Sequence, residues 1–375
     1  MTKIVIAGAS DIDDLESFVQ SMSAMNAEFV LIENEFMFSL IPPEVQVYVT
    51  KTQEYDYSNE IFLPLNEYWI SKAIAYNVSN IKSTALSASR SKFFLSQVLR
   101  EEGLACVQRY FLDDVPEDGL TQFIARLDAG YSSYGITSYK QLGVFNKDKI
   151  INAVHVPASS SMHNVLNVEA NNIVVENYLE GKEYSADVFV DKRNVKILRL
   201  SYKKVEWIQG KPICDTYITV PVSNELRSAI TQWCSALFGH TSVSFGQFDF
   251  IVTDQGSIPI DFACRIGGGL SALKQFTSHK SYIYHALCAQ GEYFAPYACQ
   301  KNIITQQVGV VDRIEYSIPK NHLLVEQIKV GDRLHDNLAS SNAKVAAVCY
   351  QSENFNTALE YSKELGKGVT VYVRE

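Results

Sequence analysis

Two aspartates stand at matching positions on either side of a predicted β-hairpin. Strand-like residues from 244 to 265 surround a loop at 254–256, whose glycine suits a left-handed turn position. If Gln255 is the centre of the hairpin, Asp249 and Asp261 face each other, because they are equally far from it. Directly opposed residues have Cβ atoms about 4.5–5.5 Å apart, and two carboxylates that close repel unless a proton or a cation intervenes. Carboxylate oxygens of this kind are typical ligands of Mg²⁺ beside a phosphate.

Arg265 extends this cluster of charges. Asp261, Ala263 and Arg265 alternate along the strand, so they share one face. A cation-binding carboxylate beside a guanidinium is suited to a phosphate, although a solvated hairpin face with an Asp–Arg pair would have the same pattern. Gly267, Gly268 and Gly269 precede a predicted helix at 270–276 and favour the phosphate site, because amides at a helix N-terminus can bind an anion.

The elements around the hairpin predict an α/β first unit and a mixed remainder. Over roughly the first 85 residues, strands alternate with a helix, which indicates a doubly wound α/β unit. The turn at Gly8 lacks a G-x-G-x-x-G pattern, so a plain strand-to-helix turn is favoured over a dinucleotide site. The predicted strands are 3–7, 30–32, 45–49, 173–178, 184–190, 307–311, 345–349 and 369–371, with a hairpin over 196–220. The predicted helices are 15–25, 89–102 with Ser89 as N-cap and Gly103 at its end, 224–238 ended by Gly239, and 357–365.

Composition excludes several classes of protein. The chain has 375 residues, 47% hydrophobic and 20% charged, which is typical of a globular protein with more than one domain. A net charge of −9 argues against nucleic-acid binding, and no apolar run is long enough to cross a membrane. Seven cysteines without a C-x-x-C pair, and a first strand where a signal peptide would stand, predict a cytoplasmic protein with reduced thiols. The histidine spacing argues against a zinc hydrolase.

Taken in order, these features resemble the ATP-grasp superfamily, in particular its carboxylate–amine ligases such as the L-amino-acid ligases. The resemblance covers nearly the whole chain. It implies a mixed α/β and α+β fold with a doubly wound N-terminal α/β domain at 1–86 and an ATP-grasp domain at 87–300. That domain would contain an antiparallel-sheet ATP-binding core and a lid subdomain at about 105–178, and a small C-terminal α/β domain would close the site at 301–375. It also implies ATP and Mg²⁺, a small-molecule carboxylate and an amine as substrates, and the homodimer common in that superfamily.

The resemblance assigns nucleotide roles to one segment. Residues 174–187 are similar to the adenine hinge of the family, so Glu176, Tyr178 and Leu179 would border the adenine. Glu183 would accept the ribose hydroxyls, because a carboxylate suits a vicinal diol. An exposed strand carboxylate is the alternative for Glu183.

The resemblance also assigns phosphate and metal roles. Residues 126–136 are similar to the strand and lid that cover the triphosphate, with contacts from Arg126, Ser132, Ser133 and Gly135. Lys92 matches a phosphate-binding lysine, although it could be an ordinary surface lysine. Asp249 and Asp261 would hold the metal, Arg265 would be catalytic, and the glycines at 267–269 would border the substrate, with Cys264 and His279 nearby.

Four residues depart from the commonest family pattern: Ser91 for Asp, Arg126 for Lys, Asp261 for Glu and Ala263 for Asn. None of them abolishes the arrangement of charges. They nevertheless leave open a non-catalytic protein that binds a nucleotide or a metabolite. A third interpretation is a carboxylase that phosphorylates bicarbonate, although the sequence has no biotin-carrier Met-Lys motif.

Overall fold

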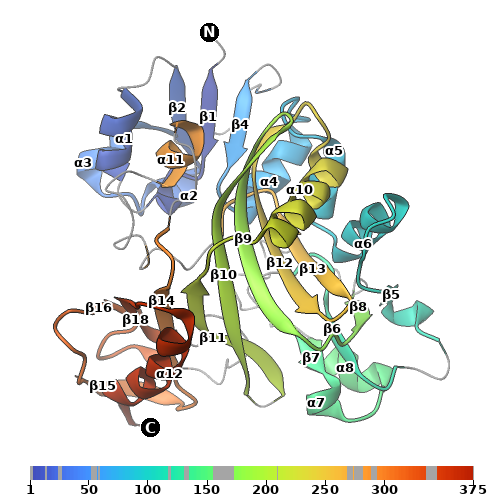
Figure 1. Ribbon diagram of the computed structural model, residues 1–375. Coiled ribbons are helices and arrows are strands. Elements are labelled where there is room, and N and C mark those ends of the chain that lie inside the picture. The colour runs from blue at the N-terminus through green and yellow to red at the C-terminus, as the bar shows by residue number, and fades with distance from the viewer. Residues whose placement is uncertain are drawn as a thin grey trace.

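A computed structural model describes residues 3–12, 15–23, 28–51, 57, 60–116, 120–130, 135–154, 173–208, 210–267, 273, 282–288, 294–334 and 344–374. A long central sheet forms the middle of the molecule, and three smaller units lie around it (Figure 1). The N-terminal unit lies at one end, the lid sheet lies beside the hairpin that carries the aspartates, and the C-terminal strands and helix lie below (Figure 1).

The N-terminal unit is a parallel sheet in the order β3-β2-β1-β4. Its strands are β1 (Ile4–Ala7), β2 (Phe29–Glu33), β3 (Val49–Lys51) and β4 (Ile61–Pro64), with α1 (Leu15–Ser23), α2 (Glu35–Phe38), α3 (Pro43–Gln46), α4 (Glu67–Ala75) and the 3₁₀ turn η1 (Ala9–Asp11) around them. The predicted strand at 45–49 is wrong over most of its length. Pro43 occupies the first turn of α3, where a missing N–H costs nothing, and the chain becomes extended only at Val49.

Two helices connect this unit to the lid, α5 (Ser83–Ala88) and α6 (Lys92–Glu101). The N-cap of α6 is Ser91, whose side chain accepts a hydrogen bond from the backbone N–H of Phe94 at 3.0 Å. The prediction of Ser89 as N-cap is therefore wrong, because Ser89 closes α5 instead. Gly103, with φ +71°, ends the helix region as predicted.

The lid is a four-stranded antiparallel sheet in the order β5-β8-β6-β7. Its elements are β5 (Arg109–Phe111), η2 (Leu112–Asp114), β6 (Phe123–Leu127), β7 (Thr137–Ser138), α7 (Tyr139–Leu142), α8 (Lys147–Val154) and β8 (Ile173–Asn177). A core of its own, around the buried Phe123, Ile150 and Val175, holds these elements together.

The central sheet has the strand order β13-β12-β9-β10-β11-β14-β18-β16. The strands are β9 (Lys182–Asp191), β10 (Asn194–Ile208), β11 (Lys211–Thr219), β12 (Val243–Thr253), β13 (Gly256–Ala263), β14 (Ala298–Ile304), β16 (Leu323–Glu326) and β18 (Lys344–Gln351). Helix α10 (Asn224–Phe238) covers one face (Figure 1), where Trp233 packs on Phe248 and Phe250. Part of the other face packs against the N-terminal unit, where Phe189 and Phe245 share a core with Phe18.

The C-terminal residues extend this sheet. Strands β14, β18 and β16 continue it from β11, so the sheet crosses the domain boundary predicted at residue 300. Beside them lie a three-stranded sheet of β15 (Gly309–Tyr316), β17 (Arg333–Leu334) and β19 (Val369–Arg374), the helix α12 (Phe355–Leu365) and η5 (Gly366–Gly368). Helix α11 (Tyr282–Cys288) packs near α1 in the N-terminal unit (Figure 1).

Gly181 lies in the connection between β8 and β9 and permits a close approach of this connection to β12. A Cβ atom built at Gly181 would lie 2.6 Å from Cγ2 of Ile251, and it would also clash with the backbone oxygen of Val252. We expect Gly181→Ala to destabilise the protein by about 1–3 kcal/mol through overpacking, measured by urea unfolding. Glu180→Ala, at the exposed neighbour, is the control and should change stability little.

Candidate active site

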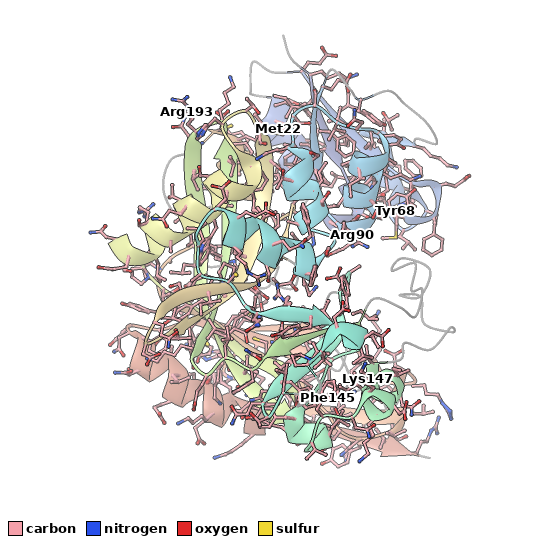
Figure 2. All side chains as sticks on the ribbon, turned by 90° about the vertical axis from the view of Figure 1, so that its right-hand side faces the viewer. Met22, Tyr68, Arg90, Phe145, Lys147 and Arg193 are labelled. Carbon is pink, nitrogen blue, oxygen red and sulfur yellow. The ribbon has the colours of Figure 1, made fainter. Side chains whose placement is uncertain are left out.

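A cleft of about 840 Å³ opens between the lid and the central sheet. In Figure 2, Arg90 lies on the side of the N-terminal unit, and Phe145 and Lys147 lie on the lid below it. Among the residues that line the cleft are Lys92, Arg126, Glu176, Tyr178, Leu179, Glu183, Asp249, Asp261 and Arg265. Residues predicted from separate motifs thus meet in one space.

Asp249 and Asp261 are direct partners across β12 and β13. The predicted opposition is confirmed, but the predicted centre of the hairpin is wrong. Thr253 pairs with Gly256, so the loop has two residues, and this register alone would place Asp249 opposite Ile260. A register shift between Asp249 and Phe250 inserts Ile260 as a bulge and brings Asp261 opposite Asp249.

The bulge is held by two arginines of the lid. Nη2 of Arg109 and Nη2 of Arg126 donate to the backbone oxygen of Ile260 at 2.6 and 2.7 Å. Arg109 did not stand out in the sequence, because it is far from the hairpin along the chain. These bonds tie the position of Asp261 to the position of the lid.

Glu176 lies between the same two arginines. Its carboxylate is 2.6 Å from Nε of Arg109 and 2.8 Å from Nη2 of Arg126. Burial alone would raise the pKa of Glu176, but Arg126 and Arg109 outweigh it and lower that pKa. Glu176 thus borders the cleft as an ion-paired carboxylate. Nε of Arg126 is buried and has no hydrogen-bond partner in the part of the chain that the structure describes.

Lys92 is buried in the cleft. Only 6% of it is exposed, and its Nζ lies 3.3 Å from Oδ1 of Asp261. The same Nζ donates to the backbone oxygens of Asp128, at 3.4 Å, and of Gly130. Burial lowers the pKa of Lys92 and the neighbouring arginines add to this, against a partial offset from Asp261. The alternative of a surface lysine is therefore wrong.

Lys203 of β10 neutralises the other aspartate. Its Nζ is 2.8 Å from Oδ2 of Asp249 and also forms an ion pair with Glu183. Burial would lower the pKa of Lys203, but Asp249 and Glu183 raise it well above its usual value. For Asp249, burial alone would raise the pKa, but the ammonium of Lys203 outweighs burial, so the pKa is lowered. Sequence reasoning missed Lys203, which the pairing of β10 with β9 places directly opposite Glu183.

Arg265 lies just beyond the end of β13 and joins two units. Its Nε donates to Glu67 at 2.7 Å, and its Nη1 donates to Gln247 at 2.7 Å. Glu67 is the first residue of α4 in the N-terminal unit and also lines the cleft. Burial raises the pKa of Glu67, but Arg265 lowers it more, so the pair is charged. No local pattern in the sequence singles out Glu67.

Some residues predicted for the site do not line the cleft, and others lie outside the described residues. In the described part of the chain, Gly135 and Gly267 are not among the residues that line the cleft, and the amide of Gly267 donates to Oδ1 of Asp187 at 3.0 Å. Cys264 is buried, and its amide donates to the hydroxyl of Ser89 at 3.0 Å. Four predicted site residues and one candidate lie outside the described residues: Ser132, Ser133, Gly268, Gly269 and His279.

The donor set of the aspartate pair fits Mg²⁺. Asp249 and Asp261 offer only oxygens, and they face each other on the cleft wall. No group of three or more His, Cys, Asp or Glu residues that could hold a metal occurs within the ranges that the structure describes. Two carboxylates without a third ligand suit Mg²⁺, which is usually completed by phosphate oxygens and water, and they do not suit a zinc site.

Residues 123–272 match the sequence family of the ATP-grasp domain. The chain carries an ATP-grasp domain. The whole chain also has the ATP-grasp fold, as its similarity to solved structures shows. The L-amino acid ligase from Bacillus licheniformis has a TM-score of 0.70 at 14% identity, over 100% of this chain and 99% of that one. No curated protein sequence matches the chain significantly.

Two further solved structures also match over their full length. The phosphoribosylglycinamide synthetase from Anaerococcus prevotii has a TM-score of 0.60 at 12% identity, over 100% of both chains. The N5-carboxyaminoimidazole ribonucleotide synthetase from Thermotoga maritima has a TM-score of 0.63 at 13% identity, again over 100% of both chains. Identities this low establish the fold, while the reaction has to be argued from the site. Among the described helices of this ATP-grasp protein, none has both the length and the apolar character of a membrane span.

Proposed function

We propose that this ATP-grasp protein is a ligase that activates a carboxylate with ATP and joins it to an amine, releasing ADP and phosphate. The observation that carries the proposal is the facing pair Asp249 and Asp261 in a cleft that also receives Lys92 and Arg265. The names of the structural neighbours support the same class, since they include an amino-acid ligase and two synthetases.

In this proposal ATP lies between the lid and the central sheet. The adenine borders Tyr178 and Leu179, and the ribose hydroxyls donate to Glu183. Lys92 and Arg126 contact the phosphates, since both are buried cations on the cleft wall. When Glu183 and Asp249 turn to the nucleotide, Lys203 loses its two partners and gains a phosphate oxygen in their place.

Asp249 and Asp261 would hold Mg²⁺ in this site. When it is bound, Mg²⁺ neutralises negative charge on the phosphate oxygens. The position of Asp261 depends on the bulge at Ile260, which Arg109 and Arg126 of the lid hold. The lid therefore contributes to the metal-binding geometry without itself providing a ligand.

The reaction has two balanced steps. A carboxylate oxygen of the substrate attacks the γ-phosphorus, the bond to the β-phosphate oxygen breaks, and ADP leaves with an acyl phosphate in place. The amine nitrogen then attacks the acyl carbon, inorganic phosphate leaves, and the amine gives up a proton. Arg265 and Lys92 stabilise the charge spread over the transferred phosphoryl group, and the enclosed cleft limits hydrolysis of the acyl phosphate.

A substrate screen tests the proposal. Purified full-length protein with Mg²⁺ and ATP is offered pairs of carboxylates and amines, starting with amino acids, and ADP release is measured. Release that needs both members of a pair supports ligation. Tight ATP binding without turnover across the panel would favour a nucleotide-binding module, an alternative motivated by the basic partners that already pair Asp249, Asp261 and Glu183. ADP release that needs bicarbonate alone would indicate a carboxylase.

A further inference from the structure

Within the described residues, one buried lysine of the cleft lacks the carboxylate partner that five other buried cations have. Five buried lysines and arginines each form an ion pair with a carboxylate: Lys92 with Asp261, Arg109 and Arg126 with Glu176, Arg199 with Asp187, and Lys301 with Asp215. Lys344 is buried to the same degree, with 7% exposed. Among the residues that the structure describes, no carboxylate forms an ion pair with it and no hydrogen bond is made by its ammonium group.

The side chain of Lys344 lines the cleft. Lys344 is the first residue of β18, opposite Ile304, and it borders the cleft together with Gln327 and Ile328. Its Nζ lies 5.9 Å from the centre of the Tyr217 ring. Burial and the nearby Lys203 lower the pKa of Lys344, against a partial offset from Cys214. Among the described residues, no carboxylate offsets the effect of burial on Lys344.

The two described titratable side chains Cys214 and Tyr217 do not neutralise Lys344. Burial raises the pKa of the Cys214 thiol to about 11, so the thiol is uncharged at pH 7. Burial also raises the pKa of Tyr217 well above its usual value, so its phenol keeps its proton and can donate a hydrogen bond. An ammonium that is largely withdrawn from water without a carboxylate partner is unfavourable, and an anion in the cleft would offset this.

This position is separate from the cations assigned to the triphosphate. Lys92 begins α6 and Arg126 lies on β6 of the lid, whereas Lys344 lies on a C-terminal strand beyond β11 and β14 in the sheet order. Lys203, to which the proposed function assigns a phosphate oxygen, lies on β10 between these positions and is separated from Lys344 by β11 and β14 in the sheet order.

We propose that Lys344, with Tyr217 beside it, forms an anion-binding subsite that takes a carboxylate or a phosphate ester on a substrate other than ATP. Only the statement that the anion belongs to a substrate rests on the proposed ligase function. The C-terminal strands then provide substrate recognition as well as closing the cleft.

Competitive labelling of lysines tests this subsite in the full-length protein. Trace acetic anhydride is applied at pH 8 with Mg²⁺ and a non-hydrolysable ATP analogue present, and acetylation of each lysine is read by mass spectrometry. The added probes are inorganic phosphate, succinate and the neutral succinamide. A bound anion that raises the pKa of Lys344 by one unit lowers the reactive amine fraction, and hence its labelling, about tenfold. The exposed Lys329 serves as an internal control.

Protection of Lys344 by phosphate alone would identify a phosphate ester, and protection by succinate alone would identify a carboxylate. Either result supports the subsite, provided that succinamide gives no protection and Lys329 is unchanged. Equal labelling of Lys344 with and without anions would overturn it. Loss of the anion-induced rise in melting temperature in Lys344→Met, but not in Lys329→Met, provides a second readout. Protection of Lys92 by the ATP analogue reports separately on the nucleotide site.

Discussion

Asp249→Asn is expected to lower ATP turnover at least about 100-fold while the protein stays folded. The substitution keeps the size and planarity of the side chain and removes the negative charge that faces Asp261 across the hairpin. Mg²⁺ would then be held by Asp261 and phosphate oxygens only. Turnover is measured as ADP release under the conditions in which the wild-type protein is active, and folding is measured by circular dichroism and thermal melting.

The hairpin provides a matched control for this experiment. Asp254→Asn makes the same chemical change at the exposed loop of the same hairpin and should leave turnover unchanged. Asp261→Asn should match Asp249→Asn, and the double variant should be little worse than either, because residues that act as one unit are not additive. Full activity in Asp249→Asn would rule out the assigned metal site.

The sequence could predict the facing aspartates because a hairpin is a local structure. Gly256, with φ +122°, marks the turn, and strand alternation places both carboxylates on one face. The bulge at Ile260 was missed, although Pro259 stands directly before it. Proline has no N–H for a ladder hydrogen bond and is confined to edge strands and bulges, and β13 is an edge strand of the central sheet. Weighing Pro259 would have predicted the bulge.

The partners of the predicted residues could not be predicted in the same way. Glu67 and Arg265 are far apart in the sequence, and Lys92 is far from Asp261, so only the packing of separate units brings them together. Lys203 faces Glu183 through the pairing of β10 with β9, which the predicted hairpin over 196–220 does not include. Local patterns thus specify which residue types face the cleft, whereas tertiary packing decides which charges neutralise each other.

The C-terminal segment shows the same difference between what local patterns predict and what tertiary packing decides. A helix and strands were predicted beyond residue 300 from their periodicity, and α12, β15, β18 and β19 occupy those segments. Their partner in the sheet was not predictable, because β14 joins β11 through residues far apart along the chain. This pairing brings Lys344 into the cleft.

Glu176→Gln is expected to lower the free energy of unfolding by about 3–5 kcal/mol, because it removes the charge between two buried guanidiniums. Urea unfolding measures the loss, and hydrogen exchange in β5, β6 and β8 locates it in the lid. Glu180→Gln, at an exposed position in the same segment, is the matched control and should be close to neutral.

The pH dependence of this loss of stability distinguishes the removal of a charge from a change in side-chain packing. Folding lowers the pKa of Glu176 below its usual 4.5, so its stabilising effect is complete above that pH and disappears as the pH falls through the lowered value. The difference between wild type and Glu176→Gln should therefore be constant from pH 6 to 8 and shrink in acid. A difference that persists unchanged at low pH would mean that packing, and not the ion pairs, holds the lid. Because Arg109 and Arg126 also hold the bulge at Ile260, the same variant should weaken ATP turnover by displacing Asp261.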